Sequence, residues 1–216
     1  DQPTLMQALD RTPGLQSLDL GAGMIQPVVR GLYGSRVAVL EDGVPQQGGR
    51  WGSDHGVLVA PELQVASAWV PGGGHVWMGP EAVGGGLRFE SPSRTNAPET
   101  QTRMGAMVQL GQLTGGLHAL HIGSTPKVHW HAGMSVTGFG SSQVPQRRFE
   151  YLGRVYQLET GALTNTAGRA GHAVLGLERE TCAGRNVAWS MRLSDVHQGL
   201  FPGIVGLPRQ GDLSPN

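Results

Sequence analysis

Cysteine, net charge and long apolar runs are scarce in this chain of 216 residues. A single cysteine, Cys182, excludes an internal disulfide, so cysteine content does not assign the chain to a compartment. Sixteen basic and sixteen acidic residues give a formal net charge of zero, which argues against a dedicated nucleic-acid binder. No apolar run approaches the ~18 residues of a transmembrane helix. The alternating strands of a membrane barrel would escape such a search.

Glycine, in contrast, is abundant, with 35 of 216 residues, over twice the roughly 7% of average usage. In the first hundred residues, glycine turns bound short apolar runs that predict strands. These strands are expected at residues 37–40, 65–70 and 87–89, after apolar residues at helical spacing in 4–9. Asp42-Gly43 favours a turn with positive φ, which glycine tolerates without steric cost. This part of the chain is expected to be a small α+β unit.

The second half of the chain alternates between apolar and polar residues. Residues 127–137 place Val128, Trp130, Ala132, Met134 and Val136 on one face, and Lys127, His129, His131, Gly133, Ser135 and Thr137 on the other. A period of two predicts a half-buried strand. Similar patterns predict five strands in all, at about 102–111, 115–123, 127–138, 169–179 and 186–197. The alternation is weakest in the second of these, at residues 117–122.

Strand length and connection length both favour a membrane barrel over a soluble sandwich, although alternation alone fits either. Strands of about 9–11 residues suit a tilted bilayer crossing. The connections at 123–126 and 180–185 are short, whereas residues 138–168 form one long connection. Outer-membrane barrels have short periplasmic turns and long external loops.

Two segments carry a family resemblance. Residues 30–44 match R-G-L-x-x-x-R-V-x-V-L-x-D-G-V at nearly every fixed position. About 40 residues on, Val70, Gly72, Gly79, Ala82, Gly84 and Gly85 fit a second glycine-rich pattern, while Pro71, Gly73 and Met78 replace its usual residues. In this order and spacing the pair resembles the plug domain of TonB-dependent outer-membrane receptors. The G-L-F-P-G-I string at 199–204 also resembles this family, particularly its metal and metal-chelate uptake members.

The resemblance implies a mainly β chain in two parts: a plug at 1–98, followed at 99–216 by the first strands, about five, of an antiparallel transmembrane β-barrel. It also implies an outer-membrane location, membrane lipid and TonB with its energising inner-membrane complex as partners, and import of zinc, an iron-siderophore or haem by plug gating. No catalytic residue, intrinsic cofactor or nucleic-acid partner is expected.

The number of strands suggests a longer protein. Large plugged transporters need about 22 strands, and a five-stranded sheet leaves two edges whose backbone groups hydrocarbon cannot satisfy. No Ton box precedes Asp1. We therefore expect the chain to be truncated at both ends relative to a full receptor.

The candidate metal ligands are Asp54 and His55, with His129 and His131 as weaker candidates. A carboxylate beside an imidazole suits Zn²⁺ or another borderline ion, and an Asp-His step in this plug loop resembles zinc-uptake members of the family. His129 and His131 project from one strand face, as does His172 from the next strand. For these three residues, a polar barrel lining is the competing interpretation.

Two other function classes remain open at this point. A soluble β-rich metal-dependent hydrolase could use Asp54, His55, His129 and His131, although the sequence lacks an acid/base carboxylate at a useful spacing. A β-sandwich binding module without transport activity would show the same strand alternation.

Overall fold

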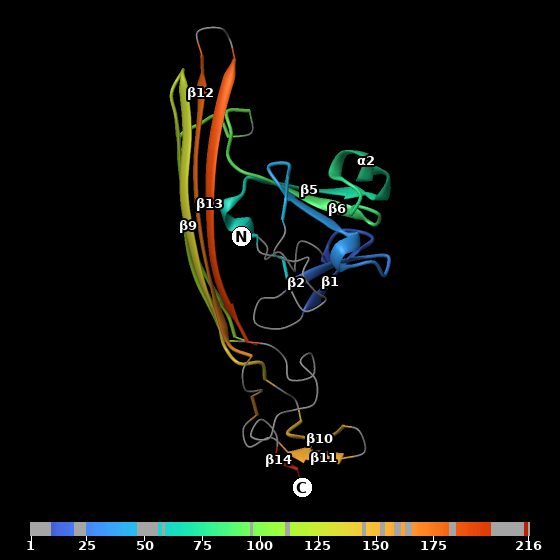
Figure 1. Cartoon of the computed structure of the whole chain (residues 1–216). Helices are drawn as coiled ribbons and strands as arrows, with labels where there is room; N and C mark the ends of the chain where they lie inside the picture. The colour runs from blue at the N-terminus through green and yellow to red at the C-terminus, as the bar shows by residue number, and fades with distance from the viewer. Residues whose placement is uncertain are drawn as a thin grey trace.

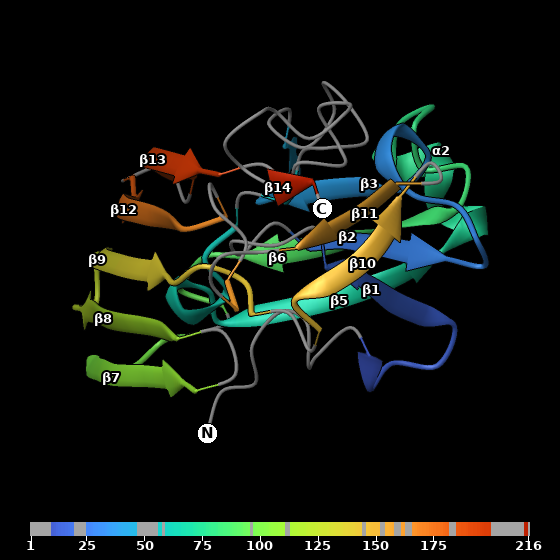
Figure 2. The same ribbon diagram turned by 90° about the horizontal axis from the view of Figure 1, so that it is seen from below.

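The computed structural model describes residues 10–19, 25–46, 56–57, 59–95, 97–110, 113–143, 146–151, 154–157, 161–162, 166–181, 185–199 and 214–215. These residues form an N-terminal unit of small sheets, here called the plug unit, and a tall antiparallel sheet, here called the wall (Figure 1). The plug unit lies against one face of the wall, as the view turned by 90° also shows (Figure 2).

The plug unit is built on a four-stranded sheet with the order β4-β3-β6-β5. Its β3 and β6 strands pair in parallel, while the two outer pairings are antiparallel. A separate antiparallel hairpin, β1 with β2, lies beside it. The bounds are β1 Leu15–Asp19, β2 Ile25–Val29, β3 Ala38–Glu41, β4 Val44–Pro45, β5 Ala66–Pro71 and β6 Gly85–Glu90, with the single-turn helices η1 Gly34–Arg36, η2 Pro61–Leu63, η3 Gly72–Gly74 and α2 His75–Met78. The three strands expected in this unit are confirmed.

Local sequence explains two of the bends. Asp42 and Gly43 both have positive φ, at 49° and 79°, and turn the chain from β3 into β4 as the Asp-Gly step predicts. Gly85 has φ of 109°, and a Cβ there would overlap Val70 and the Trp69 ring. The core of the unit gathers around Phe89, whose side chain is 1% exposed.

The wall is a meander of five antiparallel strands in the order β13-β12-β9-β8-β7. Its bounds are β7 Gln101–Gln109, β8 Thr114–Ser124, β9 Val128–Phe139, β12 Gly168–Glu180 and β13 Asn186–Gln198. All five strands expected from alternation are confirmed, with each end within two residues of its expected position.

The two faces of the wall differ as the alternation predicts. The outward face, away from the plug unit, exposes large apolar side chains: Met104, Val108, Leu117, Trp130, Met134, Val136, Leu175, Leu177, Val187, Trp189, Met191 and Leu193. The inward face carries Leu120 and Ile122, both fully buried against the plug unit. The described residues contain no helix long and apolar enough to cross a membrane.

The long connection expected at 138–168 contains a hairpin that the sequence analysis did not predict, formed by β10 Arg148–Tyr151 and β11 Arg154–Gln157. A short β14, Ser214–Pro215, adds to it. The hairpin strands are only four residues each, too short for a clear period of two. The helix expected at 4–9 lies outside the described residues.

Candidate functional site: the contact between plug unit and wall

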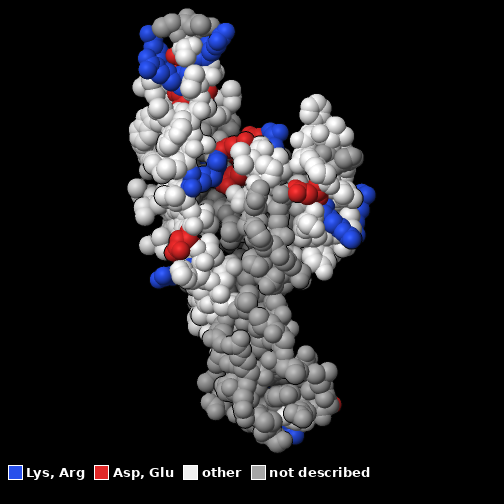
Figure 3. All heavy atoms as spheres, viewed as in Figure 1, with Lys and Arg blue, Asp and Glu red and all other residues white. Residues whose placement is uncertain are grey.

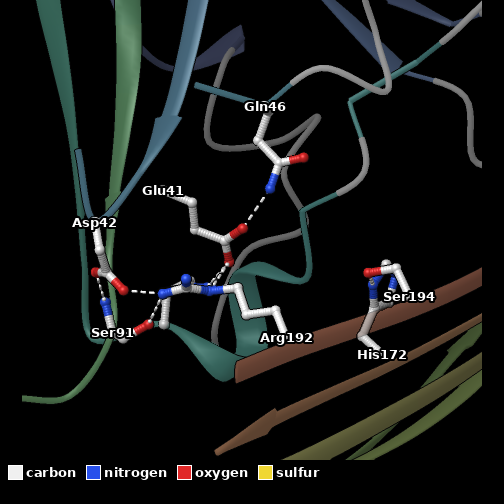
Figure 4. Close-up of polar contacts among 8 residues, drawn as sticks. Glu41, Asp42, Gln46, Ser91, His172, Arg192 and Ser194 are labelled. Carbon is white, nitrogen blue, oxygen red and sulfur yellow. Dashed lines mark hydrogen bonds and ion pairs between the residues drawn. The ribbon is translucent and has the colours of Figure 1, made fainter. Parts of the chain in front are cut away.

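A single wall arginine makes the central polar contact with the plug unit. Arg192 projects inward from β13, and its guanidinium meets Glu41 and Asp42 at the end of β3 (Figure 4). Its Nε lies 3.2 Å from Oε1 of Glu41, an ion pair without a directed hydrogen bond. One terminal nitrogen pairs with the Asp42 carboxylate and also donates to Oγ of Ser91 at 2.8 Å. We call Arg192, Glu41, Asp42 and Ser91 the Arg192 clasp.

The two carboxylates of the clasp are held in place by the plug unit itself. The Glu41 side chain is 7% exposed and accepts hydrogen bonds from the side-chain amides of Gln46 and Gln64. Asp42 accepts a 2.7 Å hydrogen bond from the backbone N–H of Ser91. A buried carboxylate is costly unless it is both hydrogen-bonded and paired. Among the described residues, the plug unit supplies the hydrogen bonds and the wall supplies the positive charge.

A second contact, at η2, combines a polar and an apolar part. Pro61 occupies the first turn of this helix, where its missing N–H has no cost. Glu62 accepts a hydrogen bond from the Ser135 hydroxyl of β9. The neighbouring Leu63 is fully buried in a cluster with Leu120 on β8 and with other wall residues. This cluster is the apolar core shared by plug unit and wall.

The connection between the two parts is also attached to the wall. Arg94 lies between β6 and β7, and its backbone N–H donates to Glu178 of β12 at 3.0 Å. Its guanidinium pairs with Glu180 at 3.0 Å and donates to the Pro126 carbonyl in the β8–β9 turn. These contacts fix the connecting segment at the end of the wall that carries the short turns.

The structure describes two of the four expected metal ligands, His129 and His131. Asp54 and His55 lie outside the described residues. His129 and His131 share the inward face of β9, as expected, and are 1% and 6% exposed. Within the part of the chain that the structure describes, neither ring nitrogen of His129 has a hydrogen-bond partner. No group of three or more His, Cys, Asp or Glu side chains among the described residues is arranged to hold a metal ion, and the metal role of these four residues stays a prediction.

The inward histidines have visible packing and hydrogen-bonding roles. The His131 ring lies over Gly176, its direct cross-strand neighbour on β12, where a Cβ would overlap the imidazole. Aromatic rings that cover cross-strand glycines stabilise sheets. His172 forms a 3.0 Å hydrogen bond between its Nδ1 and Oγ of Ser194 on β13.

Sequence reasoning missed the residues that join the two parts. Alternation along residues 186–197 puts Arg192 on the face opposite Trp189, and Glu41 and Asp42 lie within the pattern at residues 30–44. The ion pair between Arg192 and Asp42, which are 150 residues apart, could not be predicted. A single sequence contains no signal that links a strand position to a turn so distant.

Comparisons with known proteins agree with the two-part architecture. Residues 1–86 match the family model of the TonB-dependent receptor plug domain. The N-terminal part of the chain is thus similar to the plug domain of TonB-dependent receptors, a family of the bacterial outer membrane. The fold of the chain is that of a plug followed by antiparallel strands of a partial barrel.

Solved structures with a similar fold include three receptors. The copper transporter OprC has 17% identity over 91% of this chain with a TM-score of 0.64, and the ferric citrate transporter FecA has 19% identity over 91% with a TM-score of 0.62. The ferric enterobactin receptor PfeA has 13% identity over 98% with a TM-score of 0.55. The chain covers 28%, 29% and 42% of these three structures, respectively. No curated protein sequence matches significantly.

Proposed function

We propose that this chain is the plug, residues 1–98, and the first wall strands, residues 99–216, of a receptor that imports a metal ion or metal chelate by plug gating. The observation that carries the proposal is the Arg192 clasp, in which a nearly buried plug carboxylate depends on a wall cation for its countercharge. Because polar contacts re-form with water when broken, they allow a plug to leave its wall at lower cost than an extensive apolar interface would.

The ligand class is supported by three similar structures, which are a copper transporter, a ferric citrate transporter and a ferric enterobactin receptor. Asp54 and His55 are our proposed metal contacts in the plug, and His129 and His131 are weaker ones. TonB and its inner-membrane complex are the proposed energy source. The protein binds and moves its ligand and makes no covalent bond.

Calorimetry on the detergent-purified protein tests the ligand class. We expect saturable binding of zinc, haem or a ferric siderophore, with binding of the preferred ligand lost in Asp54→Ala/His55→Ala. Glu99→Ala/Asp195→Ala is a matched control, because both carboxylates lie on exposed residues. Absence of binding to all three ligands would contradict the proposal. Ligand uptake by cells that is equal with and without TonB would contradict the gating mechanism.

A further inference from the structure

The segment that joins the plug unit to the wall is bound to the wall before the first wall strand begins. Its described residues, 91–95 and 97–100, follow β6 and are here called the strap (Figure 1). β7 starts at Gln101, whose ladder partner Ile122 lies close to the short β8–β9 turn. Tension that passed from the plug unit along the strap would therefore act on the first residues of β7.

Arg94 attaches the strap to parts of the wall that are distant from β7. Its guanidinium pairs with Glu180 of β12 at 3.0 Å and donates to the Pro126 carbonyl in the β8–β9 turn. Its backbone N–H donates to Glu178, also on β12, at 3.0 Å. Two strands, β9 and β8, lie between β12 and β7 in the sheet, and Figure 3 shows acidic and basic side chains together at this end of the wall. Load on Arg94 is therefore passed to the middle of the sheet.

Two further contacts follow Arg94 along the strap. Ala97 is 3% exposed and belongs to the apolar cluster that also contains Leu120 of β8. The Thr100 hydroxyl accepts from the Ser124 N–H at 3.0 Å and donates to the Ser124 carbonyl at 3.4 Å. Because these contacts succeed one another along the chain, tension must release Arg94, Ala97 and Thr100 in turn before it acts on the β7 ladder.

The Arg94 contacts do not depend on the position of the plug unit, because all three are made with the wall. At the start of the strap, in contrast, the Ser91 N–H donates to Asp42 of the plug unit, a bond that a displaced plug would break. A single exposed ion pair contributes little to stability. The Arg94 side chain is only 24% exposed, however, and it combines an ion pair with a carbonyl contact while the backbone binds a second carboxylate. Such charge-assisted hydrogen bonds are stronger than neutral ones.

We propose that the strap is a load anchor, in which the path of tension through the plug unit ends at Arg94 and the first wall strand stays in its sheet while the plug unit is pulled. A wall strand stripped from its neighbour would leave backbone groups unpaired in hydrocarbon, which is costly. The short-turn end of a barrel faces the periplasm, so the anchor holds the load outside the hydrocarbon. The anchor rests on the proposed function only in requiring that the plug unit is pulled from its N-terminal side.

Force spectroscopy on the intact protein in lipid bilayers, pulled from the N-terminal side of the plug unit, tests the anchor. Each point of resistance is located by the length of chain released before it. Seven residues separate Arg94 from Gln101, about 25 Å of extended chain at ~3.6 Å per residue, so resistance at the two positions can be distinguished. We expect a force peak at Arg94 before that of β7 in the wild type. In Arg94→Gln this peak should be lost, and the lifetime of β7 in its sheet at constant force should fall at least about fivefold.

Arg88→Gln is the matched control, because Arg88 pairs with Glu90 on its own strand, upstream of the strap, and both force peaks should remain in it. Thr100→Val removes the Ser124 hydrogen bonds but keeps a branched side chain. It should keep the Arg94 peak and shorten the β7 lifetime, which keeps the anchor testable if Arg94→Gln assembles poorly.

Three results would overturn the anchor: a wild-type trace with no resistance before β7, an unchanged Arg94 peak in Arg94→Gln, or a β7 lifetime equal to that of the wild type in both strap variants. Loss of the peak with an unchanged thermal unfolding temperature would support load bearing over a general effect on stability. Because the instrument supplies the pull, absence of ligand binding or of TonB-dependent uptake would contradict the proposed function and leave the anchor standing.

Discussion

Removing the wall's contribution to the Arg192 clasp should loosen the plug unit without unfolding the wall. In Arg192→Gln, the Glu41 carboxylate keeps its amide donors, Gln46 and Gln64, but loses its countercharge. Asp42 keeps the Ser91 N–H and also loses its cation. Both carboxylates then favour a position in water, which only a displaced plug unit provides.

The size of the effect follows from burial. Breaking a buried ion pair by removing one partner costs about 3–5 kcal/mol. The side chains of Arg192 and Asp42 are 22% and 32% exposed, so solvent screens part of this interaction, and the retained hydrogen bonds stabilise Glu41. We therefore expect a loss of about 1–3 kcal/mol in the free energy of local opening. At ~1.4 kcal/mol per factor of ten, this accelerates amide exchange about 5- to 150-fold.

Hydrogen–deuterium exchange of β3 and β6 in the intact protein measures this opening. Arg169→Gln is the control, because this arginine is exposed on the outward face of β12. Glu41→Gln and the double variant complete a cycle in which we expect a coupling energy of about 1 kcal/mol or more. Equal exchange in Arg192→Gln and Arg169→Gln, or a coupling energy near zero, would refute the role given to the clasp.

Three further substitutions test the packing. Gly176→Ala adds a Cβ that overlaps the His131 ring, and should lower the free energy of unfolding by about 1–3 kcal/mol. In the control Gly171→Ala, on the same strand, the added Cβ meets only the Asp195 carbonyl at 3.8 Å. Equal shifts of the thermal unfolding temperature in the two variants would contradict this reasoning. Leu63→Ala should lower the free energy of plug opening, measured by hydrogen–deuterium exchange, by about 2–5 kcal/mol. Leu117→Ala is its control, because Leu117 lies on the exposed outward face. An effect of Leu63→Ala no larger than that of the control would count against the shared core. Gly43→Ala places a side chain at φ of 79° and should cost about 1–2 kcal/mol, seen as faster exchange in β3 and β4, whereas an unchanged rate there would show that the turn relaxes freely.

Strands with strict alternation were predictable because one of their faces is apolar throughout. β9 and β13 could be predicted for this reason, and the apolar residues expected on one face of each strand do share its outward face. The β1–β2 hairpin escaped prediction because its buried positions include Gln26 and its second strand contains Pro27, neither of which signals a strand.

The contacts between plug unit and wall were less predictable than the elements they join. Periodicity assigns Arg192 to the inward face, but the partner of an inward charge depends on how the plug unit packs against the wall. The same holds for Glu62, whose acceptor role toward Ser135 requires η2 to sit against β9. Sequence patterns fix local geometry, and docking is decided by shape and charge across the whole interface.

The parallel pairing of β3 and β6 has a mechanical consequence. The β1–β2 hairpin is antiparallel, so tension between its two chain ends peels its hydrogen bonds one at a time. In the β3–β6 pair the preceding chain leaves one end and the segment toward the wall leaves the other. Tension along that path shears all the ladder bonds together, which requires more force. A pull on the N-terminal side would thus extend the hairpin first and leave the central sheet folded, limiting how much of the plug unit unravels under load.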